Sequence, residues 1–301
     1  ALDVAAGDEV LCPAFTFFAT AGSVSRLGAT PVWVDSELDS YNIDLGDAAR
    51  KISSKTKVII PVHLFGQTAN MAEVKALAES HGLKVLEDAA QSLGARYGAQ
   101  MAGAMGDLGA YSFYPTKNLG GYGEGGALVT SDPALGEKAI WLRNHGMNPR
   151  YYHKFVGGNF RLDAIQAGLL RVKMPYLESY HAARRANAAC YLEAFGGIDG
   201  LILPSEGDGC FHVWNQFTIR ITDDRRDAFR AHLQERGIGN DVYYPVTLDQ
   251  QECFAGVGRG HESLKGAHQL AKEVVSLPIF PELLKSERDE VISAVQSFWG
   301  V

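Results

Sequence analysis

Val58-Ile-Ile-Pro-Val-His-Leu64 is a nearly continuous apolar run, as expected for a strand that is covered on both faces. Asn70-Met-Ala-Glu73 follows with a pattern like a capping box, and predicts a helix that ends at Gly82. The next apolar run is Lys84-Val-Leu-Glu87, which ends on Asp88. This order of strand, helix and strand is typical of a parallel sheet covered by helices.

The same alternation runs through the first half of the chain. It predicts a helix from Thr16 to about Leu27 and strands over residues 9–12, 31–34, 109–113 and 126–130. We therefore expect an α/β fold with a mostly parallel sheet sandwiched by helices. In such sheets the ligand lies beyond the carboxyl ends of the strands, where Asp88 and the segment leading to Lys117 are expected.

The second half has a different pattern. Residues 161–195 predict a long helical stretch, which Pro175 should kink or interrupt. Beyond it we expect a strand over 211–220, a helix over 225–236 and a short strand over 242–244, which together form an α+β unit. The sequence therefore predicts two domains, a large one over 1–180 and a smaller C-terminal one over 181–301.

The composition excludes several classes of protein. The 301 residues are 46% hydrophobic and 21% charged, which is ordinary for a soluble protein. The net charge of -7 argues against non-specific binding to nucleic acid or to anionic membranes, and no apolar run reaches the length of a membrane span. The four cysteines and nine histidines have no metal-ligand spacing, so we expect no metal site and a cytoplasmic protein with reduced thiols.

One lysine stands out in the stretch from Gly106 to Gly126. Lys117 follows a short aromatic strand that Pro115 should end, and glycines follow it at 120, 121, 123, 125 and 126. A lysine in such a confined place suits imine chemistry, because desolvation frees its lone pair, and the glycines would let the backbone approach a planar or anionic group. The alternative is a solvated surface lysine beside ordinary turns. A P-loop is excluded, because no Gly-Lys-Ser or Gly-Lys-Thr is present.

Six segments together resemble the nucleotide-sugar aminotransferases, the DegT/DnrJ/StrS group of fold type I pyridoxal phosphate enzymes. They keep the order and rough spacing of that family's motifs from the first residues to the last strand. The segments are Gly7–Val10 with Pro13–Thr20, Val62–Gln67, Glu87–Gly94, Phe113–Leu119, Gly158–Asp163 and Leu277–Pro281.

The resemblance implies pyridoxal 5'-phosphate as cofactor and a role for each matching residue. Lys117 would hold the cofactor covalently and move the proton during transamination, and Asp88 would pair with the ring nitrogen. The remaining cofactor contacts would come from Gln91 at the ring hydroxyl, Phe17 at the ring face, Ser112 at the phosphate and Asn159 at the phosphate of a partner subunit. That last contact implies a homodimer with shared active sites. Arg161 and Tyr244 would lie near the substrate.

Five of these roles have a plainer alternative. Asp88 could be the N-cap of a helix, Gln91 a solvated glutamine, and Phe17 a core residue. Arg161 could simply brace its loop, and Tyr244 could be a half-buried tyrosine on a strand.

The implied reaction is transamination of a nucleotide-linked keto-sugar by an amino acid, with L-glutamate as the expected donor. Its amino-sugar product would enter polysaccharide, glycolipid or glycosylated-metabolite synthesis. One alternative is a dehydratase of the same family, but there a histidine replaces the lysine. The other is a regulatory or scaffold protein that binds the cofactor without turnover.

Two departures from the family pattern bear on these expectations. Family members begin with an arm, a first strand and a Ser-Gly-Thr turn that binds phosphate, and none of these precedes Ala1. The 301 residues are therefore expected to be a fragment that binds pyridoxal phosphate weakly. Many relatives also carry a histidine at the position of Asp249. The identity of the sugar, the carbon aminated and the stereochemistry do not follow from the sequence.

Overall fold

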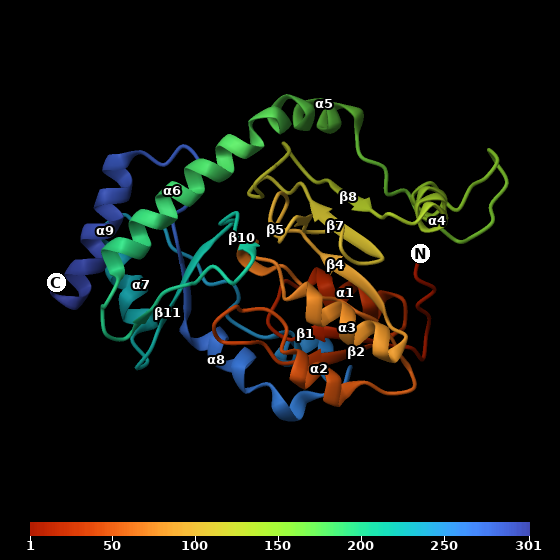
Figure 1. The fold of residues 1–301 in the computed structure, drawn as a ribbon, viewed down its shortest axis with the longest axis horizontal. Coiled ribbons are helices and arrows are strands. Elements are labelled where there is room, and N and C mark those ends of the chain that lie inside the picture. The colour runs from red at the N-terminus through yellow and green to blue at the C-terminus, as the bar shows by residue number, and fades with distance from the viewer.

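The computed structural model describes all residues 1–301 and is built on a six-stranded sheet (Figure 1). The spatial order of the strands is β2-β1-β3-β4-β7-β8, and all neighbours are parallel except β7 and β8. The predicted α/β class with a mostly parallel sheet is thereby confirmed. The strands are β1 (Glu9–Pro13), β2 (Thr30–Val34), β3 (Thr56–Ile59), β4 (Lys84–Asp88), β7 (Leu108–Ser112) and β8 (Gly126–Val129).

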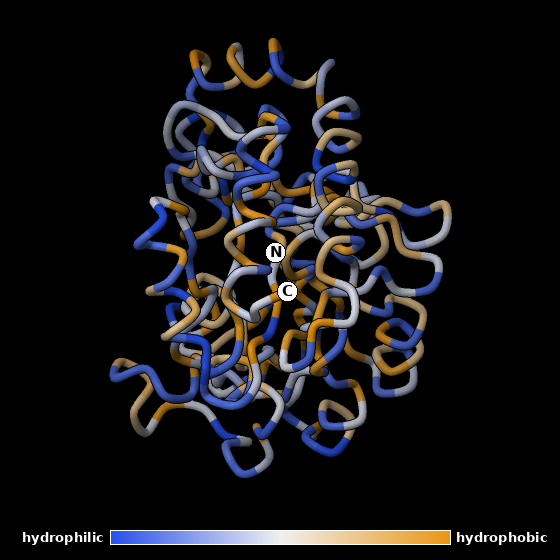
Figure 2. The backbone as a smooth tube through the Cα atoms, turned by 90° about the vertical axis from the view of Figure 1, so that its left-hand side faces the viewer, coloured by the Kyte–Doolittle hydropathy of each residue, from blue (hydrophilic) through white to orange (hydrophobic).

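Helices cover both faces of this sheet because its central strands are apolar on both sides. Val10 and Cys12 of β1 belong to one buried cluster, and Leu11 between them belongs to another. The first cluster includes residues of α1 (Ala19–Arg26) and α8 (Lys265–Glu273), and the second includes residues of α2 (Leu45–Lys51) and α3 (Met71–His81). In Figure 2 many hydrophobic stretches lie in the middle of the molecule, and others lie along its upper edge.

The C-terminal part forms a second sheet with its own core. The antiparallel strands β9 (Leu201–Ile202), β11 (Phe217–Ile221) and β12 (Val274–Leu277) lie in the order β12-β11-β9. Their apolar residues share a cluster with α6 (Leu177–Phe195), α7 (Arg226–Glu235) and α9 (Lys285–Trp299). The predicted domain boundary near residue 180 falls inside α6 and stays a prediction.

Several local predictions are confirmed. Helix α3 begins after Asn70, whose side chain accepts a hydrogen bond from the backbone of Glu73, and ends at Gly82 in the left-handed conformation (φ 66°). Pro175 lies in a 3₁₀ turn between α5 (Ala164–Lys173) and α6, so the long helical stretch is interrupted as expected.

Other predictions are wrong in extent. The strand expected over 58–64 ends at Ile59, because Pro61 follows and residues 64–66 form a 3₁₀ turn. The strand expected over 211–220 is split into β10 (Cys210–Phe211) and β11, with Trp214 between them at a positive φ of 46°. No strand forms over 242–244; the preceding residue, Asp241, makes an isolated bridge to Ser276.

Several elements were not expected, among them α2, α4, α8 and α9 and the short strands β5, β6 and β9. Strands β5 (Arg96–Tyr97) and β6 (Gln100–Met101) pair with β10 in a separate small sheet. Helix α4 (Pro133–Arg143) buries none of its residues. A helix that does not pack on a core needs no apolar stripe, and that stripe is the signal by which a helix is predicted from sequence. None of the helices combines the length and the hydropathy required to cross a bilayer.

The pH dependence of folding can be predicted from His181 on α6. Neither of its ring nitrogens has a hydrogen-bond partner, and burial, followed by the charges of Arg184 and Arg96, lowers its pKa to about 4. Histidine in an unfolded chain protonates near pH ~6.5. Between these two values the unfolded state binds a proton that the folded state does not, so the stability falls as the pH falls.

In His181→Leu the free energy of unfolding should therefore fall less steeply as the pH drops below ~6.5. The slope should decrease by up to ~1.4 kcal/mol per pH unit, which corresponds to the uptake of one proton on unfolding. Urea unfolding at a series of pH values between neutral and mildly acidic measures this slope. The control is His81→Leu at an exposed histidine. Equal slopes for His181→Leu and the unsubstituted protein would contradict the prediction.

Candidate active site

The expected site residues gather at the carboxyl ends of β4 and β7. Asp88 is the last residue of β4 and Ser112 the last of β7, and the two strands are parallel neighbours. Lys117 follows in a turn in which its N–H donates to the carbonyl of Tyr114 at 2.9 Å. Desolvation lowers the pKa of Lys117 below its ordinary value, and the charge of Asp88 partly offsets this shift. Adjacent strands thus bring a carboxylate near enough to a desolvated amine for its charge to act on the pKa of that amine.

Two hydrogen bonds hold the carboxylate of Asp88. Its Oδ2 accepts from Thr20 Oγ1 at 2.7 Å, and its Oδ1 accepts from the N–H of Ala90 at 3.2 Å. No helix starts after Asp88, so the alternative of a helix N-cap is wrong. Thr20 was not among the predicted site residues, although it ends the Pro13–Thr20 segment that contains Phe17.

Gln91 is buried and links three segments of the chain. Its Oε1 accepts from the N–H of Phe65 at 2.6 Å, and its Nε2 donates to the hydroxyl of Tyr244 at 3.1 Å. Burial, followed by the charge of Asp88, raises the pKa of Tyr244. The alternatives of a solvated glutamine and of a strand tyrosine are therefore both wrong, and Tyr244 lies beside the Asp88 group.

Phe17 leaves much of its ring uncovered. Its exposed fraction is 58%, whereas Phe15 two residues earlier is 1% exposed. The Phe17 ring lies 6.0 Å from that of Tyr244, centroid to centroid. An aromatic side chain at a strand end, open to solvent and next to buried neighbours, can stack on a planar ligand. The alternative of a core residue is wrong.

The glycines after Lys117 have a packing role within the chain. A Cβ on Gly120 would lie 2.2 Å from the carbonyl oxygen of Pro115, and one on Gly121 would lie 2.9 Å from Gln166 Oε1. Gln166 Oε1 also accepts from the N–H of Tyr122 at 2.9 Å. These glycines allow the loop to pack against its own chain and α5. Their expected approach to a planar or anionic group stays a prediction.

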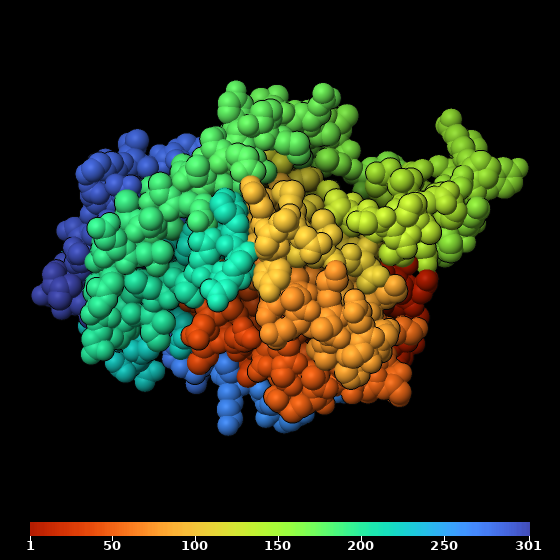
Figure 3. Space-filling model, in the orientation of Figure 1, coloured from red at the N-terminus to blue at the C-terminus, as the bar shows by residue number.

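Asn159 and Arg161 form no hydrogen bond with Asp88, Gln91 or Lys117 within one chain. Both belong to an exposed segment, where Arg161 Nη1 donates to Asn144 Oδ1 at 2.7 Å and the Arg161 N–H donates to Asn159 Oδ1 at 3.3 Å. Figure 3 shows the chain near residue 150 projecting from the right-hand side of the molecule, whereas residues 158–160 hydrogen-bond back to residues 142–145. The segment's own contacts match the alternative in which Arg161 braces its loop.

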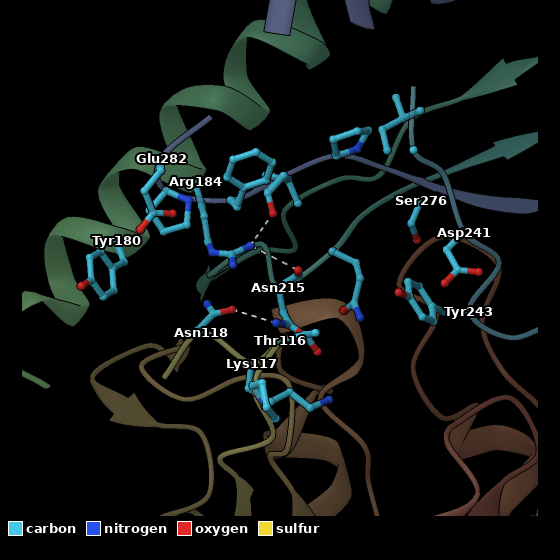
Figure 4. A pocket seen from close by; sticks show the side chains of 18 of the residues that line it. Thr116, Lys117, Asn118, Tyr180, Arg184, Asn215, Asp241, Tyr243, Ser276 and Glu282 are labelled. Atoms are coloured by element: carbon cyan, nitrogen blue, oxygen red, sulfur yellow. Dashed lines mark hydrogen bonds between the residues drawn. The ribbon is translucent and has the colours of Figure 1, made fainter. Parts of the chain in front are cut away.

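A cleft of about 540 Å³ separates the Lys117 segment from the C-terminal sheet. Figure 4 shows Lys117 on one wall and Arg184 and Asp241 on others. Asp88, Gln91 and Phe17 do not line this cleft, so Lys117 stands between it and the Asp88 group. Arg184 and Asn215 were not predicted, because no local pattern distinguishes them. The remaining lining residues come mostly from 115–118, 239–243 and 276–282.

Comparison with known proteins identifies relatives along the whole chain. The "Pleiotropic regulatory protein" of Geobacillus stearothermophilus is 46% identical over 303 residues, covering 99% of this chain and 80% of that protein. The "dTDP-3-amino-3,4,6-trideoxy-alpha-D-glucose transaminase" of Streptomyces venezuelae is 41% identical over 297 residues, covering 99% and 78%. The crystal structure of S. venezuelae DesV in complex with a ketimine intermediate superposes with a TM-score of 0.96 at 41% identity, covering 100% of this chain and 80% of that one.

The resemblance inferred from the six segments is confirmed at the level of the family. The DegT/DnrJ/EryC1/StrS aminotransferase family matches residues 1–296. The chain belongs to the DegT/DnrJ/EryC1/StrS aminotransferase family.

Proposed function

We propose that this protein transfers an amino group from an amino acid, L-glutamate, to the keto group of a nucleotide-linked sugar. The family and its cofactor, pyridoxal 5'-phosphate, make it an aminotransferase. The observation that carries the proposal is the placement of Lys117 and Asp88 at the ends of neighbouring strands, beside the uncovered ring of Phe17. The named transaminase relative supports a nucleotide-linked sugar as substrate. The four unpaired cysteines fit a cytoplasmic location.

The chemistry of these side chains fits the cofactor. The Lys117 amine, with its lowered pKa, suits the aldehyde of the cofactor. The fixed carboxylate of Asp88 suits the ring nitrogen of the cofactor, and the open face of Phe17 suits the planar ring. Lys117, Asp88 and Phe17 would hold these three parts, with Gln91 at the ring hydroxyl and Ser112 at the phosphate. When bound, the cofactor supplies an electron sink for the carbon that loses or gains a proton.

The protein's own groups then perform the positioning and the proton transfer. Desolvation keeps a larger share of the Lys117 amine neutral, so its Nζ can accept a proton and return it. Thr20 and the Ala90 N–H fix the Asp88 carboxylate in one orientation, which keeps its negative charge aimed at one point. Gln91 and Tyr244 restrain each other by their shared hydrogen bond.

Lys117 also separates this proposal from the family dehydratases, since those carry a histidine in its place. A regulatory role without turnover is the second candidate, and the printed name of the Geobacillus relative favours it. The two candidates differ in whether the bound cofactor reacts with amino donors.

Substitution of Lys117 and Asp88 tests the assignment. Lys117→Ala should remove the visible absorbance of covalently held cofactor and lower turnover by ~10²-fold or more, because the proton carrier is lost. Asp88→Asn should retain covalent attachment but slow the reaction, because an amide does not stabilise a protonated ring nitrogen. Absorbance spectra and single-turnover rates with L-glutamate, followed by nucleotide keto-sugars, measure both effects.

The matched control is Lys84→Ala, which removes an exposed lysine paired with Asp107. It should leave spectra and rates unchanged. An absorbance that does not respond to any amino donor in the unsubstituted protein would contradict transamination and favour the regulatory role.

We also propose that the protein acts as a homodimer with shared active sites. Helix α5 buries only Leu170, and large apolar side chains on it and on the extended segment before it are exposed. Many exposed large apolar side chains on one stretch of the chain are typical of a subunit interface. Asn159 belongs to the same segment, which supports its predicted reach into the partner's cofactor site. The exposed side chains are Tyr151 (74%), Tyr152 (70%), Val156 (102%), Phe160 (71%), Ile165 (79%) and Val172 (68%).

The dimer is tested by placing charges on this surface. Ile165→Asp combined with Val172→Asp should shift the mass measured by light scattering from two chains to one, because two charges would be buried at the interface. Activity should be lost together with the dimer, while an unchanged circular dichroism spectrum shows that each chain stays folded. Leu27→Asp, at a leucine that is 57% exposed on another surface, is the control and should remain dimeric. A single chain in the unsubstituted protein would refute the proposal.

A further inference from the structure

Asn118, the residue after Lys117, uses its side chain to fasten this segment to the far wall of the cleft. It is 7% exposed. Its Nδ2 donates to the carbonyl of Val213 at 3.0 Å, and its Oδ1 accepts from Asn215 Nδ2 at 2.8 Å. Figure 4 draws the bond between Asn118 and Asn215 directly beside Lys117. The amide thus joins two segments that are 97 residues apart in the sequence.

The segment that receives Asn118 is itself held firmly. Arg184 Nη1 donates to the carbonyls of Trp214 at 3.0 Å, Asn215 at 3.3 Å and Ile279 at 2.7 Å. Trp214 has a positive φ of 46°, its N–H donates to His212 Nδ1 at 2.9 Å, and its ring stacks on that of His212 at 3.8 Å. A residue persists in a strained conformation only where its surroundings fix it. The 213–215 segment is therefore a rigid anchor.

Arg184 has a structural reason to be buried there. It is 6% exposed and forms no ion pair with a carboxylate, so its charge is balanced by the three carbonyl oxygens. Hydrogen bonds therefore connect Arg184 of α6 to Asn215, and Asn215 to Asn118. Asn118 is joined to Lys117 by a peptide bond.

We propose that Asn118 and Asn215 are positioning residues for the reaction, which set the place of the Lys117 amine relative to the opposite wall of the cleft. The inference rests on the proposed role of Lys117. A displacement of about 1 Å at a reacting group can lower a rate ~10²-fold. The loop has a second anchor in Leu119, which is 1% exposed and packs with Phe113 and Leu170. Loss of the amide bond should therefore move the amine without unfolding the loop.

Asn118→Ala, Asn215→Ala and the double variant test the proposal. Each single variant should lower kcat 10-fold or more, with the KM for the amino donor changed less than 3-fold. The double variant should be no slower than the slower single variant, because both remove one shared interaction. Asn215→Ala also keeps the bond from Asn118 to Val213, so it serves as the milder change.

A second readout does not depend on the cofactor. In cofactor-free protein, the pH dependence of Lys117 acetylation by acetic anhydride, followed by peptide mass spectrometry, reports the titration of the amine. Both single variants should move this titration toward that of an ordinary lysine, since a displaced amine gains water. The control is Asn187→Ala, which removes a buried asparagine bonded to the Phe280 carbonyl, and it should leave the titration unchanged.

The outcomes separate this inference from the proposed function. An unchanged Lys117 titration and kcat in both single variants would overturn it, as would effects that add in the double variant. If the unsubstituted protein does not hold its cofactor through Lys117, the proposed function fails. If it does, and both single variants leave the Lys117 titration and kcat unchanged, only the positioning role fails.

Discussion

The site depends on the hydrogen bonds that the carboxylate of Glu87 accepts. This carboxylate is fully buried and accepts four hydrogen bonds, from His63 Nε2 at 2.8 Å and from the N–H groups of Gly103, Met105 and Gly106 at 2.7, 2.6 and 2.5 Å. Burial by itself would raise the pKa of Glu87, but the bonds from His63 and the backbone outweigh it and lower the pKa. Hydrogen bonds to a charged group each contribute ~1.5–3 kcal/mol, so this residue strongly fixes its surroundings.

The position of Glu87 explains why this matters for the site. Glu87 precedes Asp88, and successive side chains of a strand point to opposite faces. Glu87 therefore holds the 103–106 turn that leads into β7, while Asp88 is free to face the site. Since β7 carries Ser112 and leads to Lys117, this buried carboxylate fixes the entry of β7, and the direct pairing of β4 with β7 then sets the two strand ends side by side.

The site combines rigid and open parts. Asp88, Gln91 and the Lys117 loop are held by hydrogen bonds or close backbone packing, whereas the Phe17 ring is left uncovered. A preorganised set of polar groups around an open aromatic face can bind a planar cofactor at little cost in ordering the protein. The exposed segment that contains Asn159 has the opposite character, which is why its role is assigned to the dimer.

The sequence by itself determined the class of fold, the strand ends that carry Asp88 and Lys117, and the family. Apolar runs and helix caps are local signals, so the strand–helix–strand unit over 58–88 and the stop at Gly82 could be predicted from neighbouring residues. Only the tertiary structure decided the break at Trp214, the absence of a strand over 242–244 and the link from Asn118 to Asn215. Each of these depends on contacts between residues far apart in the chain. A hydrogen bond between two side-chain amides produces no periodic pattern in the sequence. Its partners, Asn118 and Asn215, come together only when the six-stranded sheet and the C-terminal sheet have both folded.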